Sequence, residues 1–167
     1  RTFDEIDVGA SVSVSRTLTA TDVEALALAA GDVEGFHIEG GSLEDRLSAQ
    51  GAAAIALIAG LLNRRLPGPG SAIVGTRFHY SGACYVGDTL TATVTAKRKL
   101  GEGHRIEFAG RCVNQSGEVL VDGIATVVAP TQRIAYANVA TPEMILRRND
   151  GFAKLFKRCE ALPPATC

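Results

Sequence analysis

An aspartate and a histidine in the first quarter of the chain are the side chains best suited to proton transfer. Asp32 follows Gly31, and His37 lies five residues further on. A chain that leaves a helix and turns can bring such a carboxylate and imidazole onto one water molecule, and the carboxylate can also fix the tautomer of the ring. Asp32 is equally suited to a turn after a helix-stopping glycine, so a purely structural role is the alternative.

The other residues with chemical potential have simpler interpretations. His79 and His104 lie in strand patterns without an acidic or cysteine partner at ligand spacing, which indicates surface or strand-face positions. Arg64 and Arg65 could meet phosphate groups, but solvated charges commonly end a helix. The run Gly68–Gly70 lacks the third glycine and the strand–helix context of a nucleotide-binding loop. We therefore expect neither a metal ion nor a bound cofactor.

The composition is that of an ordinary globular chain. The 167 residues are 46% hydrophobic and 21% charged, and the formal net charge is -1. This balance gives no electrostatic reason to expect nucleic acid or an anionic membrane as a partner. The longest apolar run, Gly51 to Leu62, is shorter than the ~20 residues that span a bilayer. Four cysteines without zinc or disulfide spacing, and no visible signal peptide, favour a reduced protein in the cytoplasm.

Two helices are expected to position the Asp32–His37 segment. The first follows a half-buried strand over Ala10–Leu18, begins with capping residues at Thr19–Asp22 and ends at Gly31. A loop-like stretch over Gly31–Ser48 leads to the second helix, Ala49–Arg64. This helix is apolar on every face, so it must be covered by other structure.

Strands with period-two alternation follow this apolar helix. They are expected near Ala72–Tyr80, Thr89–Leu100, Arg105–Asn114 and Val119–Ala129, as consecutive antiparallel strands joined by tight turns. One buried helix lying across a curved antiparallel sheet gives an α+β architecture. The alternation then stops, and Asp150–Leu162 has the pattern of a separate amphipathic helix.

Two motifs give the chain a resemblance to a known family. Gly31-Asp32-Val33-Glu34-Gly35-Phe36-His37 is similar to the G-D-x-N-P-x-H motif of MaoC-like, (R)-specific enoyl-CoA hydratases, which have the hot-dog fold. Tyr85-Val86-Gly87-Asp88-Thr89-Leu90 is similar to the V-G-D-x-L strand entry of the same family. The resemblance covers roughly Phe3 to Thr131 and implies a hot-dog domain over residues 1–131.

The residues after this domain resemble a different unit. Residues 132–149 are expected to be a linker, and residues 150–167 the start of a following domain. The N-terminal run, the turn at Leu66–Gly70 and the tail resemble bacterial proteins that fuse such a domain to a phosphate acetyl- or butyryltransferase.

The resemblance implies roles for three residues. Asp32 and His37 would be the acid/base pair that adds water to a short-chain 2-enoyl-CoA thioester, which is a substrate and not a cofactor. Gly51 would present a backbone N–H to the thioester oxygen from the start of the apolar helix, where N–H groups lack partners. Its alternative role is to permit close packing. The resemblance also implies a homodimer, with the strand around Arg105–Asn114 or its neighbour at the seam.

Departures from the family pattern keep two other functions in view. Glu34 and Gly35 replace Asn-Pro, and the chain between His37 and Gly51 is shorter than the family's by about four residues. These departures favour a non-catalytic acyl-CoA-binding or dimerisation domain of a fused acyltransferase. An acyl-CoA thioesterase on the same fold would need a carboxylate on the central helix to activate water. The predicted helix Ala49–Leu62 contains none.

Overall fold

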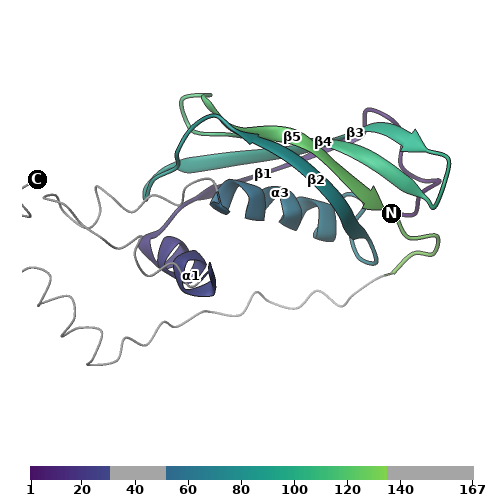
Figure 1. The fold of residues 1–167 in the computed structure, drawn as a ribbon, viewed down its shortest axis with the longest axis horizontal. Helices are drawn as coiled ribbons and strands as arrows, with labels where there is room; N and C mark the ends of the chain where they lie inside the picture. The colour runs from purple at the N-terminus through teal and green to yellow at the C-terminus, as the bar shows by residue number, and fades with distance from the viewer. Residues whose placement is uncertain (31–51, 135–167) are drawn as a thin grey trace, which may run out of the picture.

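An antiparallel sheet curves over one helix in the computed structural model, which describes residues 1–30 and 52–134 (Figure 1). Within these residues the elements are, in chain order, β1 (Ser11–Thr17), α1 (Ala20–Ala30), α3 (Ala52–Arg64), β2 (Ala72–Tyr80), β3 (Thr89–Leu100), β4 (Arg105–Val113) and β5 (Val119–Val128). The predicted strands therefore agree with the structure to within a residue or so at each end. No helix in residues 1–30 or 52–134 is long and apolar enough to cross a membrane.

The order of the strands differs from a simple run of hairpins. The five strands are arranged as β1-β3-β4-β5-β2, and every neighbouring pair is antiparallel. β2 thus pairs with β5 and not with β3, the next strand in the chain, because residues 81–88 cross the end of the sheet. The prediction of a seam at Arg105–Asn114 or its neighbour is wrong, since β4 and both its neighbours are interior strands. Among the strands of the described residues, only β1 and β2 lie at an edge of the sheet.

The core lies between the sheet and α3, as alternation along the strands requires. In β3 the side chains of Leu90, Ala92, Val94 and Ala96 are buried, whereas the threonines between them are half-buried. α3 contributes Ala53, Ala54, Ile58, Leu61 and Leu62. The small residues among these allow the helix to approach the sheet closely.

Among the described residues, α3 is covered by the sheet and is also contacted by α1. Ala52, Ala56 and Asn63 are exposed, and Ile55 and Ala59 are half-buried. Within residues 1–30 and 52–134 the helix is therefore buried mainly on the face that meets the sheet.

A pair of glycines makes room for an aromatic side chain at the β2 edge. Gly110 of β4 and Gly123 of β5 are direct partners in the sheet. A Cβ atom at Gly110 would lie 2.9 Å from Ile58 Cγ2 and 3.0 Å from Phe78 Cε1. A Cβ atom at Gly123 would lie 2.1 Å from the Arg77 carbonyl oxygen and 2.8 Å from Phe78 Cα. The glycines therefore leave space for Phe78, whose side chain packs against the core beside β5 and β4.

Several predictions lie outside the described residues. They are the loop Gly31–Ser48, the first residues of the central helix, the linker beyond residue 134, and the amphipathic helix within residues 150–167. These stay predictions.

Candidate functional site

The predicted acid/base pair belongs to a segment that is held at both ends by described helices. Asp32 and His37 lie outside the described residues, as does Gly51. α1 ends at Ala30, two residues before Asp32, and α3 begins at Ala52, directly after Gly51. The C-terminal end of α1 and the N-terminal end of α3 are therefore the described positions that bound the segment with Asp32 and His37.

α1 begins with a reciprocal capping box. The Asp22 backbone N–H donates to Thr19 Oγ1 at 3.2 Å, and the Thr19 backbone N–H donates to Asp22 Oδ2 at 3.0 Å. The Arg16 guanidinium forms an ion pair with the same carboxylate. Partial burial acts to raise the pKa of Asp22, but the Thr19 hydrogen bonds and Arg16 outweigh it and lower the pKa below its ordinary value. The carboxylate is therefore charged near neutral pH and stabilises the helix start.

Two apolar side chains fasten α1 to the rest of the core. Val23 is 4% exposed, and Leu26 packs against the buried cluster. Figure 1 shows α1 beside the end of β1, close to one end of α3. Val23 and Leu26 thus anchor the first half of α1 to the core, and the chain enters the Asp32–His37 segment from the other end of this helix.

α3 supplies the second boundary of the segment. The first turn of a helix leaves backbone N–H groups without intrahelical partners, and its dipole is positive at that end. Gly51 directly precedes this turn in the sequence, so the proposed oxyanion donor belongs to the start of α3. The described helix Ala52–Arg64 contains no carboxylate. The thioesterase alternative needs a carboxylate on this helix, and the described residues of the helix provide none.

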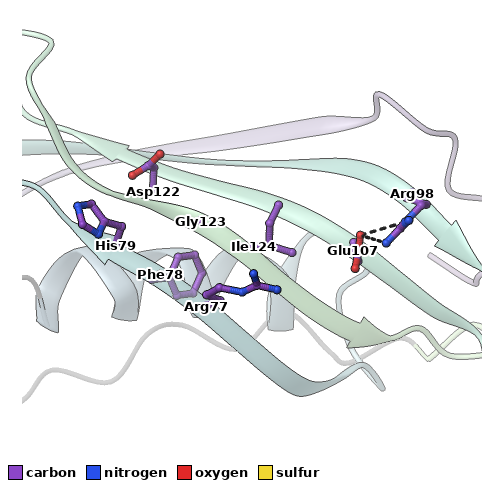
Figure 2. Close-up of a pocket in the computed structure, with 8 residues that line it drawn as sticks. All are labelled: Arg77, Phe78, His79, Arg98, Glu107, Asp122, Gly123 and Ile124. Atoms are coloured by element: carbon purple, nitrogen blue, oxygen red, sulfur yellow. Dashed lines mark hydrogen bonds and ion pairs between the residues drawn. The ribbon is translucent and has the colours of Figure 1, made fainter.

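A second feature, on the sheet face opposite α3, was missed by sequence reasoning. Figure 2 shows a hollow of about 530 Å³ lined by side chains from four strands, among them Arg77, His79, Asp122 and Ile124. His79 lies directly opposite Asp122 in the β2–β5 register, so it does have an acidic neighbour, which corrects the expectation from sequence spacing. No sequence signal could have placed this aspartate, because the pairing of β2 with β5 brings together residues from distant parts of the chain.

The remaining sequence candidates are surface residues, as predicted. His104 is exposed in the turn between β3 and β4, where its φ is 53°, and its ring meets Phe3 edge-on with centroids 5.4 Å apart. Arg64 and Arg65 are exposed at the end of α3, and Arg65 donates a hydrogen bond of 3.4 Å to the Ser13 carbonyl oxygen. These contacts are structural.

The described cysteines are core residues. Cys84 and Cys112 are both buried. Burial, and to a lesser degree the nearby Cys84, raises the pKa of the Cys112 thiol to about 11. Because the thiolate is the reactive form, Cys112 is unreactive at neutral pH. Within residues 1–30 and 52–134, no group of His, Cys, Asp or Glu is arranged to hold a metal ion.

Known proteins share both the sequence pattern and the fold. No family model matches the chain. It is 29% identical to the (R)-specific enoyl-CoA hydratase of Rhodospirillum rubrum over 134 residues, which cover 78% of this chain and 92% of that protein. It is 26% identical to a 3-hydroxybutyryl-CoA dehydratase of Methylorubrum extorquens over 142 residues, which cover 80% of this chain and 87% of that protein.

A solved structure confirms the predicted fold. The structure is similar to the unliganded R-hydratase PhaJ1 of Pseudomonas aeruginosa, with a TM-score of 0.78 and 25% sequence identity. The match covers 87% of this chain and 96% of the solved one. The α+β hot-dog architecture expected from the strand pattern and motifs is therefore confirmed.

Proposed function

We propose that this chain, a relative of (R)-specific enoyl-CoA hydratases in sequence and fold, is itself an (R)-specific 2-enoyl-CoA hydratase of the MaoC-like, hot-dog type. The observation that carries the proposal is a similarity that runs through nearly the whole length of a known hydratase. The chain also contains Gly31–His37, which is similar to the hydratase motif. The substrate is a short-chain 2-enoyl-CoA thioester.

The reaction adds water across a carbon–carbon double bond, and each proposed residue has one task in it. Asp32 and His37 hold one water molecule and take a proton from it as its oxygen bonds to the β-carbon. The same pair then delivers a proton to the α-carbon, so that one water is consumed and no other reactant is needed. The reverse sequence dehydrates a 3-hydroxyacyl-CoA.

The thioester oxygen gains negative charge in the transition state. The backbone N–H of Gly51, at the start of α3, stabilises this charge in the proposed arrangement. The positive end of the helix dipole acts in the same direction. The fixed position of α3 against the sheet supports this role, because an oxyanion donor must be held in place before the charge develops.

The proposed assembly is a homodimer formed through the β2 edge. Among the described strands, β2 pairs with β5 and has no strand on its other side, where its backbone groups are available for pairing. Val74 and Tyr80 of this strand are both 54% exposed, which is unusual for large apolar side chains. Pairing of β2 with a second copy would satisfy the edge and cover part of this apolar surface.

The cellular setting is the cytoplasm in this proposal. The buried, unreactive Cys112 thiol is compatible with a reducing compartment. Residues 150–167 are proposed to begin a following domain, of the phosphate acyltransferase type suggested by the sequence pattern.

The decisive experiment measures hydration of crotonyl-CoA by its loss of absorbance, with chiral analysis of the 3-hydroxy product. Asp32→Asn and His37→Gln should each lower kcat by roughly 10²–10⁴-fold with the fold intact. His79→Gln is the matched control, because His79 lies on the sheet face opposite α3 and should retain full activity. Equal activity in all three variants would exclude the proposed pair.

Acyl-CoA binding and thiol release, measured beside the hydration assay, separate the alternative functions. A parent protein that binds acyl-CoA and hydrates none of a series of enoyl-CoAs would be a non-catalytic binding domain, as the Glu34 and Gly35 departures suggest. Release of free thiol from acyl-CoA would reveal a thioesterase. The absence of a carboxylate from α3 argues against that activity.

A further variant pair tests the oxyanion donor. Gly51→Pro removes the N–H and is compatible with the first turn of a helix, so it should fold and lose turnover by roughly 10²-fold. Gly51→Ala keeps the N–H and should retain most of the activity. Equal losses in both variants would assign the glycine to packing.

A further inference from the structure

The outer face of the sheet, opposite α3, divides into two halves of different chemistry. On the half formed by β1 and β3, eight hydroxyl side chains form four cross-strand pairs. Their oxygen–oxygen distances are 2.9 Å for Ser11–Thr95 and 2.8 Å for each of Ser13–Thr93, Ser15–Thr91 and Thr17–Thr89. Each hydroxyl already has a partner within the chain, so this half gains little from contact with another protein.

The half formed by β4, β5 and β2 holds polar groups without such partners. A hollow of about 530 Å³ is lined by Arg77, His79, Asp122 and Ile124. Figure 2 shows Ile124 on the same side of the hollow as Arg77 and Glu107, with His79 and Asp122 on the other side. Within the described residues, neither Arg77 nor Asp122 takes part in a hydrogen bond or an ion pair through its side chain. A second hollow of about 210 Å³ adjoins the first and shares Arg77, Glu107 and Ile124 with it.

The charges of this half have a small positive excess. Arg98 and Glu107 neutralise each other in an ion pair of 2.9 Å. Arg77, Arg105 and Arg111 remain against Asp122, and Arg111 lies directly opposite Asp122 on β4. An excess of two positive charges is too small to select a polyanion such as nucleic acid or an acidic membrane, which needs a basic patch. Arg77 and Asp122 have opposite charges and lie beside the apolar Ile124, so they are instead complementary to the same residues of a second copy.

We propose that the outer face of β4, β5 and β2 is an isologous interface between two copies of this chain. A two-fold axis through this face brings Arg77 of each copy to Asp122 of the other and covers both Ile124 side chains. This contact uses a sheet face, whereas the proposed dimer uses the β2 edge, so the two together assemble a tetramer from two edge-paired dimers. The inference does not depend on the proposed activity.

Sedimentation velocity of the full chain over a wide range of protein concentrations tests this interface. The parent protein should reach twice the mass that its edge pairing alone produces. Arg77→Glu and Asp122→Arg should each weaken this association about 30-fold or more, because like charges then face each other across the axis. Lys97→Glu makes the same change of charge at an exposed site on β3 and should leave the mass unchanged.

Mixing the two variants gives the sharpest result. Arg77→Glu places two carboxylates on the face, and Asp122→Arg places two guanidinium groups there, so a mixed complex has opposite charges at both contacts. The mixture should recover the larger mass that neither variant reaches alone, and added salt should weaken it. A parent protein that never exceeds the edge-paired mass would overturn the proposal, as would a mixture that does not associate.

Discussion

β1 and β2 are the two edge strands of one sheet, and they differ in how their side chains are satisfied. Ser11, Ser13, Ser15 and Thr17 of β1 each bond a threonine of β3. β2 has Val74 and Tyr80 exposed, and no side-chain hydrogen bond to β5 occurs among the described residues. Open edges attract other strands unless polar or charged groups protect them. The difference favours β2 over β1 as the edge that pairs with a second copy in the proposed dimer.

The largest expected effect comes from Gly123 of β5, whose backbone packs closely against β2. Gly123→Ala should lower the free energy of unfolding by about 3 kcal/mol or more, because the new methyl group would overlap the Arg77 carbonyl oxygen and β2 would have to move. Urea denaturation measures this loss.

Gly75→Ala in the same strand pair is the control for this effect. Its new Cβ would lie 3.9 Å from Thr126 Cβ, an ordinary contact. If the two substitutions cost the same, the glycine pair does not control how closely β2 packs.

A lysine on each edge strand tests the difference between the edges directly. Val74→Lys should raise the dissociation constant of the proposed edge-paired dimer by about 100-fold, because a charged side chain would be desolvated at the seam. Ser13→Lys on β1 should leave it unchanged, since β1 is not part of the proposed seam. Light scattering across a dilution series gives both constants. The reverse pattern would move the seam to β1.

The smallest effect is expected within the hydroxyl pairs of β1 and β3. A double-mutant cycle with Ser13→Ala and Thr93→Ala should give a coupling energy of about 0.5 kcal/mol, as for a solvent-exposed cross-strand hydrogen bond. Thermal unfolding of the four proteins provides the values. A coupling several times larger would mean that these hydroxyls act as a cooperative network.

Alternation along the chain was enough to predict most of the secondary structure. β3 alternates threonines with apolar residues, and the capping residues at Thr19–Asp22 mark the start of α1. The order of the strands could not be predicted in this way. Alternation shows which side chains share a face, but it does not show which strand lies beside which, so it could not reveal that β2 pairs with β5.

The hollow on the outer face escaped prediction for the same reason. Arg77, His79 and Asp122 are ordinary polar residues at outward positions of two strands, and only the β2–β5 register brings them together. The proposed acid/base pair is the opposite case. Asp32 and His37 are close in sequence, so a motif could identify them, although they lie outside the described residues.

The position of β1 has a consequence for how the chain acquires its structure. β3, β4 and β5 follow one another through short turns, so their pairing involves local contacts and should form early. The bonds between β1 and β3 join residues 72–84 positions apart, and β1 is synthesised well before its partner. During synthesis the β1 segment is therefore expected to emerge before the strand that pairs with it. The four hydroxyl residues of the β1 segment favour its contact with water until β3 is available. Polar residues of this kind lower the tendency of an unpaired segment to aggregate.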